Sequence, residues 1–281
     1  MRKQAAAAER DRKAYDLAWR YLLHLPSAGV SEELLQHYLN PPSNRDTPNA
    51  MADVFRRLLE SAQNRGMMAT VIGGSIGGVG TLGPILGGFS PTSAIQRFAS
   101  PEEFLNAIKQ ELRPVGKFRR GRGSLWPLFA RAVLSGAQFL GQFASGPEFI
   151  EWVRVFDADG RKRAALPMLL SQEIDGFGFA LACDFLKELG FVNFAKPDVH
   201  VKAVVRGLRL SSKTANDYAV FKAVVRIASN CGKTPYAVDK LFWLVGSGRF
   251  YDHPEMGKKG RVRTNRNEFV RSARQLLTAA A

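Results

Sequence analysis

Apolar residues recur at intervals of three and four along most of this chain, the spacing that places them on one face of an α-helix. The clearest case is the segment 48–62. Its apolar face is formed by Met51, Val54, Phe55, Leu58 and Leu59. No segment has the pattern of a convincing β-strand, and no internal repeat is present. The sequence therefore predicts an all-α protein.

Capping residues and prolines mark the ends of the predicted helices. Pro26 ends the first helix, Ser31 is suited to cap the second, and Ser100 followed by Pro101 is suited to begin another. The predicted helices cover approximately residues 1–25, 32–39, 48–62, 100–112, 124–141, 147–156, 164–174, 179–189, 198–208, 216–229, 234–245 and 266–278.

The chain is strongly basic. Its 281 residues include 40 lysines and arginines against 25 acidic residues, for a formal net charge of +15. A polyanion such as duplex DNA is the natural partner for such a surface. A ribosome-associated protein, or a merely basic one, would share this composition.

Cysteine usage and the first residues bear on the cellular compartment. Cys183 and Cys231 are the two cysteines, and their spacing argues against a disulfide framework, a zinc site and an iron–sulfur cluster. The first twenty residues carry charges throughout and lack the apolar core of a secretory signal. We expect a cytoplasmic, nucleoid-associated protein.

The segment 66–96 carries no charged residue and is rich in glycine. Gly78, Gly80 and Gly83 match the G-x-G-x-x-G pattern of dinucleotide-binding proteins, but the strand that this motif requires is not predicted before it. A membrane span is also poorly supported, because the segment is only weakly apolar. We favour closely packed helix and loop beside a cleft.

A basic loop follows at residues 113–122. Its five cationic residues lie among glycines and one proline, and they are Arg113, Lys117, Arg119, Arg120 and Arg122. Such a cluster favours contact with DNA phosphates. A charged loop that simply faces solvent is the alternative.

Two glycines separated by one residue stand between two amphipathic helices, in the sequence Ile174–Gly178. Glycine makes a tight turn there and lets backbone N–H groups approach an anion, which the N-terminus of the following helix also attracts. Such a hairpin can hold a DNA phosphate without reading sequence. An ordinary turn between helices would have the same two glycines.

Residues 166–208 resemble the helix-hairpin-helix superfamily of DNA glycosylases, which includes endonuclease III. The family hairpin is usually written L-P-G-V-G-x-K-T-A, and here it reads I-D-G-F-G-F-A-L-A over Ile174–Ala182. The family then places an aspartate in a V-D-T-H or V-D-V-H context. Here Pro197, Asp198, Val199 and His200 occupy those positions, and Asp198 follows Ala180 by eighteen residues, as in endonuclease III-like members.

The resemblance implies roles for individual residues. Asp198 would be the catalytic carboxylate, because breaking an N-glycosidic bond builds positive charge on the sugar. It could instead serve only as a helix cap. Ala180 stands where bifunctional members carry the lysine that attacks the sugar, which implies a monofunctional enzyme.

Further residues are implied to contact DNA. Those at the hairpin are Gly176, Phe177, Gly178 and Ala180, and those at the end of the upstream helix are Gln63, Asn64 and Arg65, where the family fills the gap left by the flipped nucleotide. Lys202 could contact a phosphate, and His200 is more suited to a structural role.

The predicted organisation has three parts: an N-terminal helical extension (1–45), a two-lobed glycosylase core with the hairpin and Asp198 in its cleft (46–255), and a basic C-terminal tail (256–281). The expected function is removal of a damaged or modified base from double-stranded DNA, in base excision repair or in defence against modified foreign DNA. The alternative is a non-catalytic DNA-binding module. We expect a monomer that uses no membrane and no cofactor, with a monovalent cation at the hairpin left open.

Overall fold

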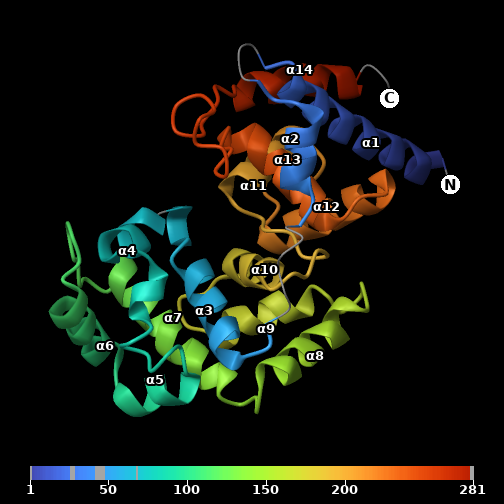
Figure 1. Ribbon diagram of the computed structural model, residues 1–281. Coiled ribbons are helices and arrows are strands. Elements are labelled where there is room, and N and C mark those ends of the chain that lie inside the picture. Colours follow the sequence, from blue (N-terminus) through green and yellow to red (C-terminus); the bar gives the residue numbers. More distant parts are fainter. Residues whose placement is uncertain (1, 26–28, 42–47, 68, 279–281) are drawn as a thin grey trace. The chain divides into compact units, whose positions relative to one another are not determined.

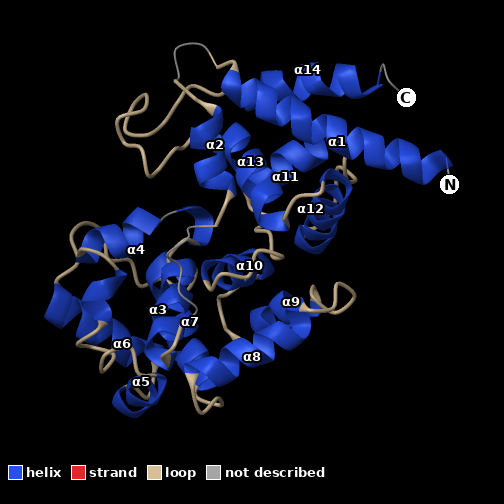
Figure 2. Cartoon of the chain, turned by 45° about the vertical axis from the view of Figure 1, so that its right-hand side comes forward, coloured by secondary structure: helices blue, strands red, loops and turns tan. Residues whose placement is uncertain are grey.

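The computed structural model describes residues 2–25, 29–41, 48–67 and 69–278. Within these ranges the regular secondary structure is entirely helical, and only isolated β-bridges join Arg249 and Gly257 to Arg261. The all-α prediction is therefore confirmed (Figure 2). The chain divides into two compact units: unit 1 comprises residues 1–45 and 191–281, and unit 2 comprises residues 46–190.

Unit 1 is organised around α13, whose residues are nearly all buried. This helix begins at Pro235 behind the N-cap Thr234 and contacts the other five helices of the unit. The helices of unit 1 are α1 (Arg2–Leu23), α2 (Glu32–Leu39), α11 (Val199–Gly207), α12 (Asp217–Cys231), α13 (Pro235–Ser247) and α14 (Arg266–Thr278). In Figures 1 and 2, α1 and α14 lie side by side.

The N-terminal helices differ from the predicted extension. Ala14, Ala18 and Leu22 form a buried face of α1 that packs on α12 and α13, and α2 also packs on α13. Residues 1–45 therefore belong to the same unit as α11–α14, and the predicted core of 46–255 is divided after Gly190. Amphipathic periodicity shows that a helix has a buried face, but it does not show which distant helix covers that face.

Unit 2 is organised around α7, which contacts α3, α4, α5, α6 and α9. Gly136 lets α3 approach α7 closely, because a Cβ there would lie 3.0 Å from a methyl carbon of Leu58. The helices of unit 2 are α3 (Met51–Ala62), α4 (Ala69–Ile76), α5 (Pro91–Arg97), α6 (Pro101–Ala107), α7 (Leu125–Leu140), α8 (Gly146–Asp157), α9 (Ala165–Glu173) and α10 (Phe179–Glu188). Short η1 (Arg65–Met67), η2 (Val79–Leu82) and η3 (Ile108–Leu112) complete it.

Most predicted boundaries agree with the observed ones to within a few residues. The helix predicted at 100–112 is the main exception, since α6 ends at Ala107 and continues as the π-helical η3. The glycine-rich segment forms α4, η2 and α5, which agrees with packed helix and loop.

Two observations on the described residues bear on the alternatives for the glycine-rich segment. Its G-x-G-x-x-G pattern spans η2, and no strand precedes that element among the described residues. In the part of the chain that the structure describes, no helix combines the length and apolar character required to cross a bilayer.

Candidate functional site

Asp198 is the N-cap of α11, and its backbone is extended, with φ −77° and ψ −177°. Its Oδ1 atom accepts hydrogen bonds from the backbone N–H groups of His200 and Val201, each at 2.9 Å. The preceding Pro197 is buried, and the proline ring restricts the chain as it enters the helix. The carboxylate is therefore held in one orientation by the backbone itself.

The second oxygen of this carboxylate has a different environment. Both hydrogen bonds end on Oδ1, and Oδ2 accepts none from the described residues. Burial raises the pKa of Asp198 above its usual range, although the hydrogen bond from Val201 acts in the opposite direction. The nearby carboxylate of Asp239 raises the pKa further, whereas Lys196 and His200 lower it. The side chain thus presents one oxygen to a partner from a poorly solvated position.

Asp239 also fixes the segment that leads to Asp198. It lies on α13 with a relative exposure of 1%, and its Oδ2 accepts a 3.0 Å hydrogen bond from the backbone N–H of Lys196. Sequence reasoning missed this residue. Its signal, a single aspartate in an apolar helix, is weak in the sequence because nothing there shows which loop it contacts.

His200 and Lys202, which follow Asp198 in α11, make structural contacts within unit 1. The Nζ atom of Lys202 pairs with Asp217 Oδ1 at 2.7 Å, so its ammonium is already engaged. His200 packs on α13, where a Cβ at Gly246 would lie 2.7 Å from the His200 Cβ. The ring of His200 also meets Trp243 edge to face, with centroids 6.4 Å apart. These contacts fit the structural role expected for His200.

In unit 2 the hairpin joins α9 to α10. Gly176 has φ +77°, which favours glycine, and a Cβ there would lie 2.8 Å from the Leu128 carbonyl oxygen. The N–H of Phe177 donates to the Ile174 carbonyl at 3.0 Å and closes the turn, while the Phe177 ring is buried. Phe177 therefore anchors the hairpin and does not offer its ring to a ligand.

Gly178 is the N-cap of α10 and provides no side-chain cap. It is exposed, and a Cβ there would meet no atom within 4 Å. Ala180 follows in the first turn. The first N–H groups of a helix have no acceptor within the helix, so this open end is suited to an anion.

The end of the upstream helix braces the hairpin. The guanidinium of Arg65 donates to the Gly176 carbonyl, and the Asn64 amide donates to Asp184 Oδ2 at 3.2 Å. Gln63 is the C-cap residue of α3, and its Oε1 atom lies so close to Gly73 that a Cβ at position 73 would clash with it. The structure thus brings Asn64 and Arg65 together with α10 and the hairpin, as supports within unit 2.

The basic loop has little regular structure, and its arginines have different surroundings. Arg120 pairs with Glu102 at 2.7 Å and lies over the Phe118 ring. Arg119 lines a cavity of about 620 Å³ together with Lys117 and Trp126. Arg122 is exposed. Arg119 and Arg122 are therefore the better placed of the three predicted arginines to meet a phosphate.

The predicted site residues divide between the units. Asp198, His200 and Lys202 belong to unit 1, whereas the hairpin, Gln63–Arg65 and the basic loop belong to unit 2. Within the described residues, no group of three or more histidine, cysteine or acidic side chains could hold a metal ion. Comparison with models of known protein families, with curated proteins and with solved structures found no match.

Proposed function

We propose that the protein is a monofunctional DNA glycosylase that removes a damaged or modified base and leaves an abasic site. In this proposal the two units are the lobes of a helix-hairpin-helix glycosylase. The observation that carries it is the Asp198 carboxylate, whose Oδ1 is held by two backbone amides while Oδ2 accepts no hydrogen bond from the described residues. The K-P-D-V-H sequence around this residue supports the same assignment, as does the hairpin motif, whose Ala180 lies eighteen residues upstream.

The chemistry follows from that carboxylate. When the bond between base and C1′ breaks, the bonding electrons leave with the base and positive charge develops on the sugar. A negative oxygen held close to the sugar stabilises this charge more than it stabilises the neutral substrate, which lowers the barrier. Water then adds to C1′ and loses a proton to Oδ2, which releases it to solvent, while the departing base takes up a proton from solvent. The products are a free base and an abasic deoxyribose.

The hairpin would supply binding that is independent of sequence. A phosphate at the open end of α10 would meet backbone N–H groups and the positive end of the helix. Arg65 holds the Gly176 carbonyl and so limits movement of the turn that presents these groups. A base that is stacked inside the duplex cannot reach a carboxylate of the protein, so the target nucleotide would be flipped out of the duplex.

The experiment is a panel of duplexes with oxidised, alkylated, mismatched or hypermodified bases, together with modified phage DNAs, scored for released base by mass spectrometry. The proposal predicts release from at least one substrate, with strand breaks only after heat or alkali. Because Ala180 has no amine, borohydride should trap no covalent complex. A trapped adduct would show that another lysine, such as Lys196, is a nucleophile.

The rival is a DNA-binding module in which Asp198 only caps α11. The observed cap is consistent with this rival, because both hydrogen bonds to Oδ1 are those of an N-cap. Tight duplex binding with no base released from any member of the panel would support this rival.

A further inference from the structure

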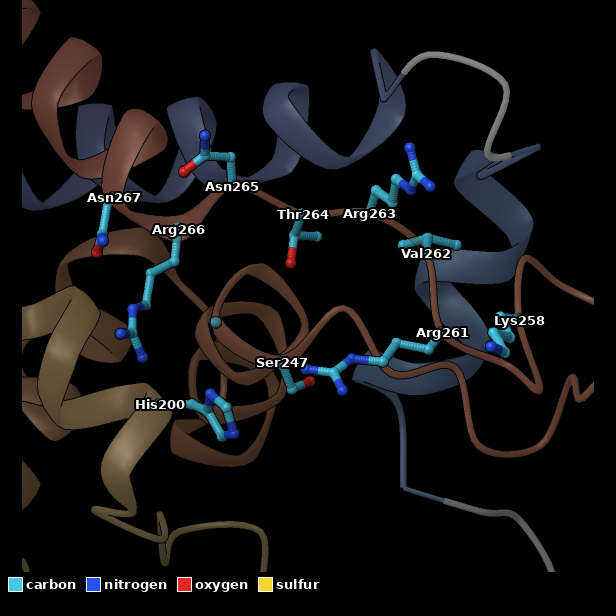
Figure 3. Close-up of a pocket in the computed structure, with 11 residues that line it drawn as sticks. His200, Ser247, Lys258, Arg261, Val262, Arg263, Thr264, Asn265, Arg266 and Asn267 are labelled. Carbon is cyan, nitrogen blue, oxygen red and sulfur yellow. The ribbon is translucent and has the colours of Figure 1, made fainter.

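Unit 1 contains a cationic site of its own, which adjoins His200. A cavity of about 780 Å³ is formed where the loop before α14 passes over the end of α13 and the start of α11 (Figure 3). His200 and Ser247 lie on one side of it. Lys258, Arg261, Arg263 and Arg266 contribute on the other side, with Thr264, Asn265 and Asn267 among them.

The charge of this cavity is not balanced locally. No acidic residue lines it, and the four cationic side chains form no ion pair with any described residue. In Figure 3, Arg261 extends toward Ser247 and Arg266 extends toward His200, whereas Arg263 points away. Arginines that are left unpaired around a shared hollow repel one another, so an anion between them would lower the free energy of the site.

The loop that carries these arginines is built from specific backbone contacts. Gly248 has φ +65°, and its carbonyl accepts a 2.8 Å hydrogen bond from the Val262 N–H. The Phe250 N–H donates to the Gly260 carbonyl at 2.6 Å. Two β-bridges also involve Arg261. The guanidinium of Arg261 is therefore presented from a held backbone, which reduces the entropy lost when a ligand binds.

Helix α14 adds polar groups at its start. Asn265 accepts a hydrogen bond from the Glu268 N–H at 3.1 Å and donates to the Glu268 carboxylate at 2.9 Å, which keeps that acid at the helix cap. On the opposite wall, the Nδ1 atom of His200 is buried without a hydrogen-bond partner among the described residues. The cavity thus has two converging guanidinium groups on one side and, on the other, the His200 side chain, whose Nδ1 atom is buried.

We propose that this cavity binds backbone phosphates of the DNA strand whose nucleotide Asp198 acts on. The inference rests on the proposed function. His200 lines the cavity and lies two residues beyond Asp198 in the first turn of α11, so a strand that passes through the cavity would be the one whose nucleotide reaches Asp198. Guanidinium groups bind phosphates and carboxylates alike. Several unpaired arginines spaced along an open cavity of this size suit the repeated phosphates of a strand that passes through it.

The test compares two double variants that remove the same charge. Arg261→Gln/Arg266→Gln removes the guanidinium groups that point into the cavity. Arg271→Gln/Arg274→Gln removes two arginines farther along α14 that do not line it. Affinity for an unmodified duplex is measured as a function of salt. The cavity variant should lower the slope of log affinity against log salt by up to about two, and the control by clearly less. Equal slopes in the two variants would overturn the proposal.

A second measurement uses the unchanged protein and so does not depend on the folding of a variant. Duplex DNA should protect Arg261 and Arg266, but not Arg271, from an arginine-specific reagent such as phenylglyoxal, as read by peptide mass spectrometry. Absence of protection would overturn the proposal. Inorganic phosphate alone, at the same ionic strength, should protect much less. Equal protection by inorganic phosphate would identify a site for a small anion and would also overturn it.

These readouts separate the two proposals. Both use unmodified DNA and require no base release, so they remain informative if the glycosylase assignment fails. Base release that depends on Asp198, combined with unaltered salt slopes, would remove the cavity from the DNA interface and leave the proposed reaction intact.

Discussion

The starts of α10 and α11 lie only twenty residues apart in the sequence, but they differ in the chemical groups that they offer to a ligand. Gly178 begins α10 with no side-chain cap and with open space around its Cα. Asp198 begins α11 with a carboxylate that satisfies two backbone N–H groups. One helix start is suited to receive an anion, whereas the other already holds its own.

The same local feature, a helix start, is therefore suited to two tasks. An uncapped start attracts phosphate through its free N–H groups and helix dipole. At a start capped by aspartate, the same groups fix the orientation of the carboxylate, and the second oxygen can act on a developing cation. Substitutions at these two helix starts exchange or remove the properties that distinguish them.

The largest effect is expected for Asp198→Asn. Asparagine also caps helices, so α11 should remain folded, while the negative charge that is proposed to stabilise the sugar cation is lost. Base release should fall by roughly 10²–10³-fold, the size seen when one group that stabilises a transition state is removed. Single-turnover rates at saturating protein would measure this. Asp16→Asn, at an exposed position on α1, is the matched control. Full activity in Asp198→Asn would reduce this residue to a cap.

Gly178→Asp makes the start of α10 resemble that of α11. The new carboxylate would cap the helix and occupy the place of a phosphate, so duplex affinity should fall about tenfold, as for loss of one charge-assisted hydrogen bond. Stability should not decrease, because aspartate is a better N-cap than glycine. Gly80→Asp is the control, since a Cβ there also meets open space. Unchanged affinity would mean that the hairpin is only a turn.

Gly176→Ala tests the turn of the hairpin, and Gly178→Ala tests the exposed start of α10. Alanine at φ +77° is strained, and its Cβ would press on the Leu128 carbonyl oxygen. The free energy of unfolding should fall by about 1–3 kcal/mol. Gly178→Ala should change it by only a few tenths to about 1 kcal/mol. Urea denaturation of both variants checks this, and equal losses would contradict the different roles of the two glycines.

The smallest effect concerns the pH at which Asp198 loses its charge. Burial raises the pKa of Asp198, so its carboxylate becomes protonated at a higher pH than an ordinary aspartate, which titrates at about 3.9. In the proposed reaction, base release should therefore begin to decline at that higher pH. Replacing Asp239 with asparagine removes one cause of the raised pKa. The acidic decline of kcat/KM should then move to lower pH, whereas Asp16→Asn should leave it in place. An unmoved profile would show that another group controls the acidic decline.

Much of this protein could be predicted from the order of its residues. The helical spacing in 48–62 predicted α3 and its buried face, and Ser100 with Pro101 marked the start of α6. The motif indicated that Asp198 would begin a helix and that two glycines would form the turn before α10. These features are local: dihedral preferences, capping hydrogen bonds and apolar periodicity act over a few residues.

Which distant residues come into contact depends on how the helices pack in three dimensions. It placed α1 against α12 and α13, joined Arg65 to the Gly176 carbonyl, set Asp239 beneath the segment that leads to Asp198, and gathered Arg261 and Arg266 around His200. Burial of apolar faces depends on area and shape rather than on sequence separation, so the chain pattern shows that a face must be covered without showing what covers it. The electrostatic surroundings of Asp198 have the same origin, since desolvation and the charge of Asp239 arise only when α13 packs beside α11.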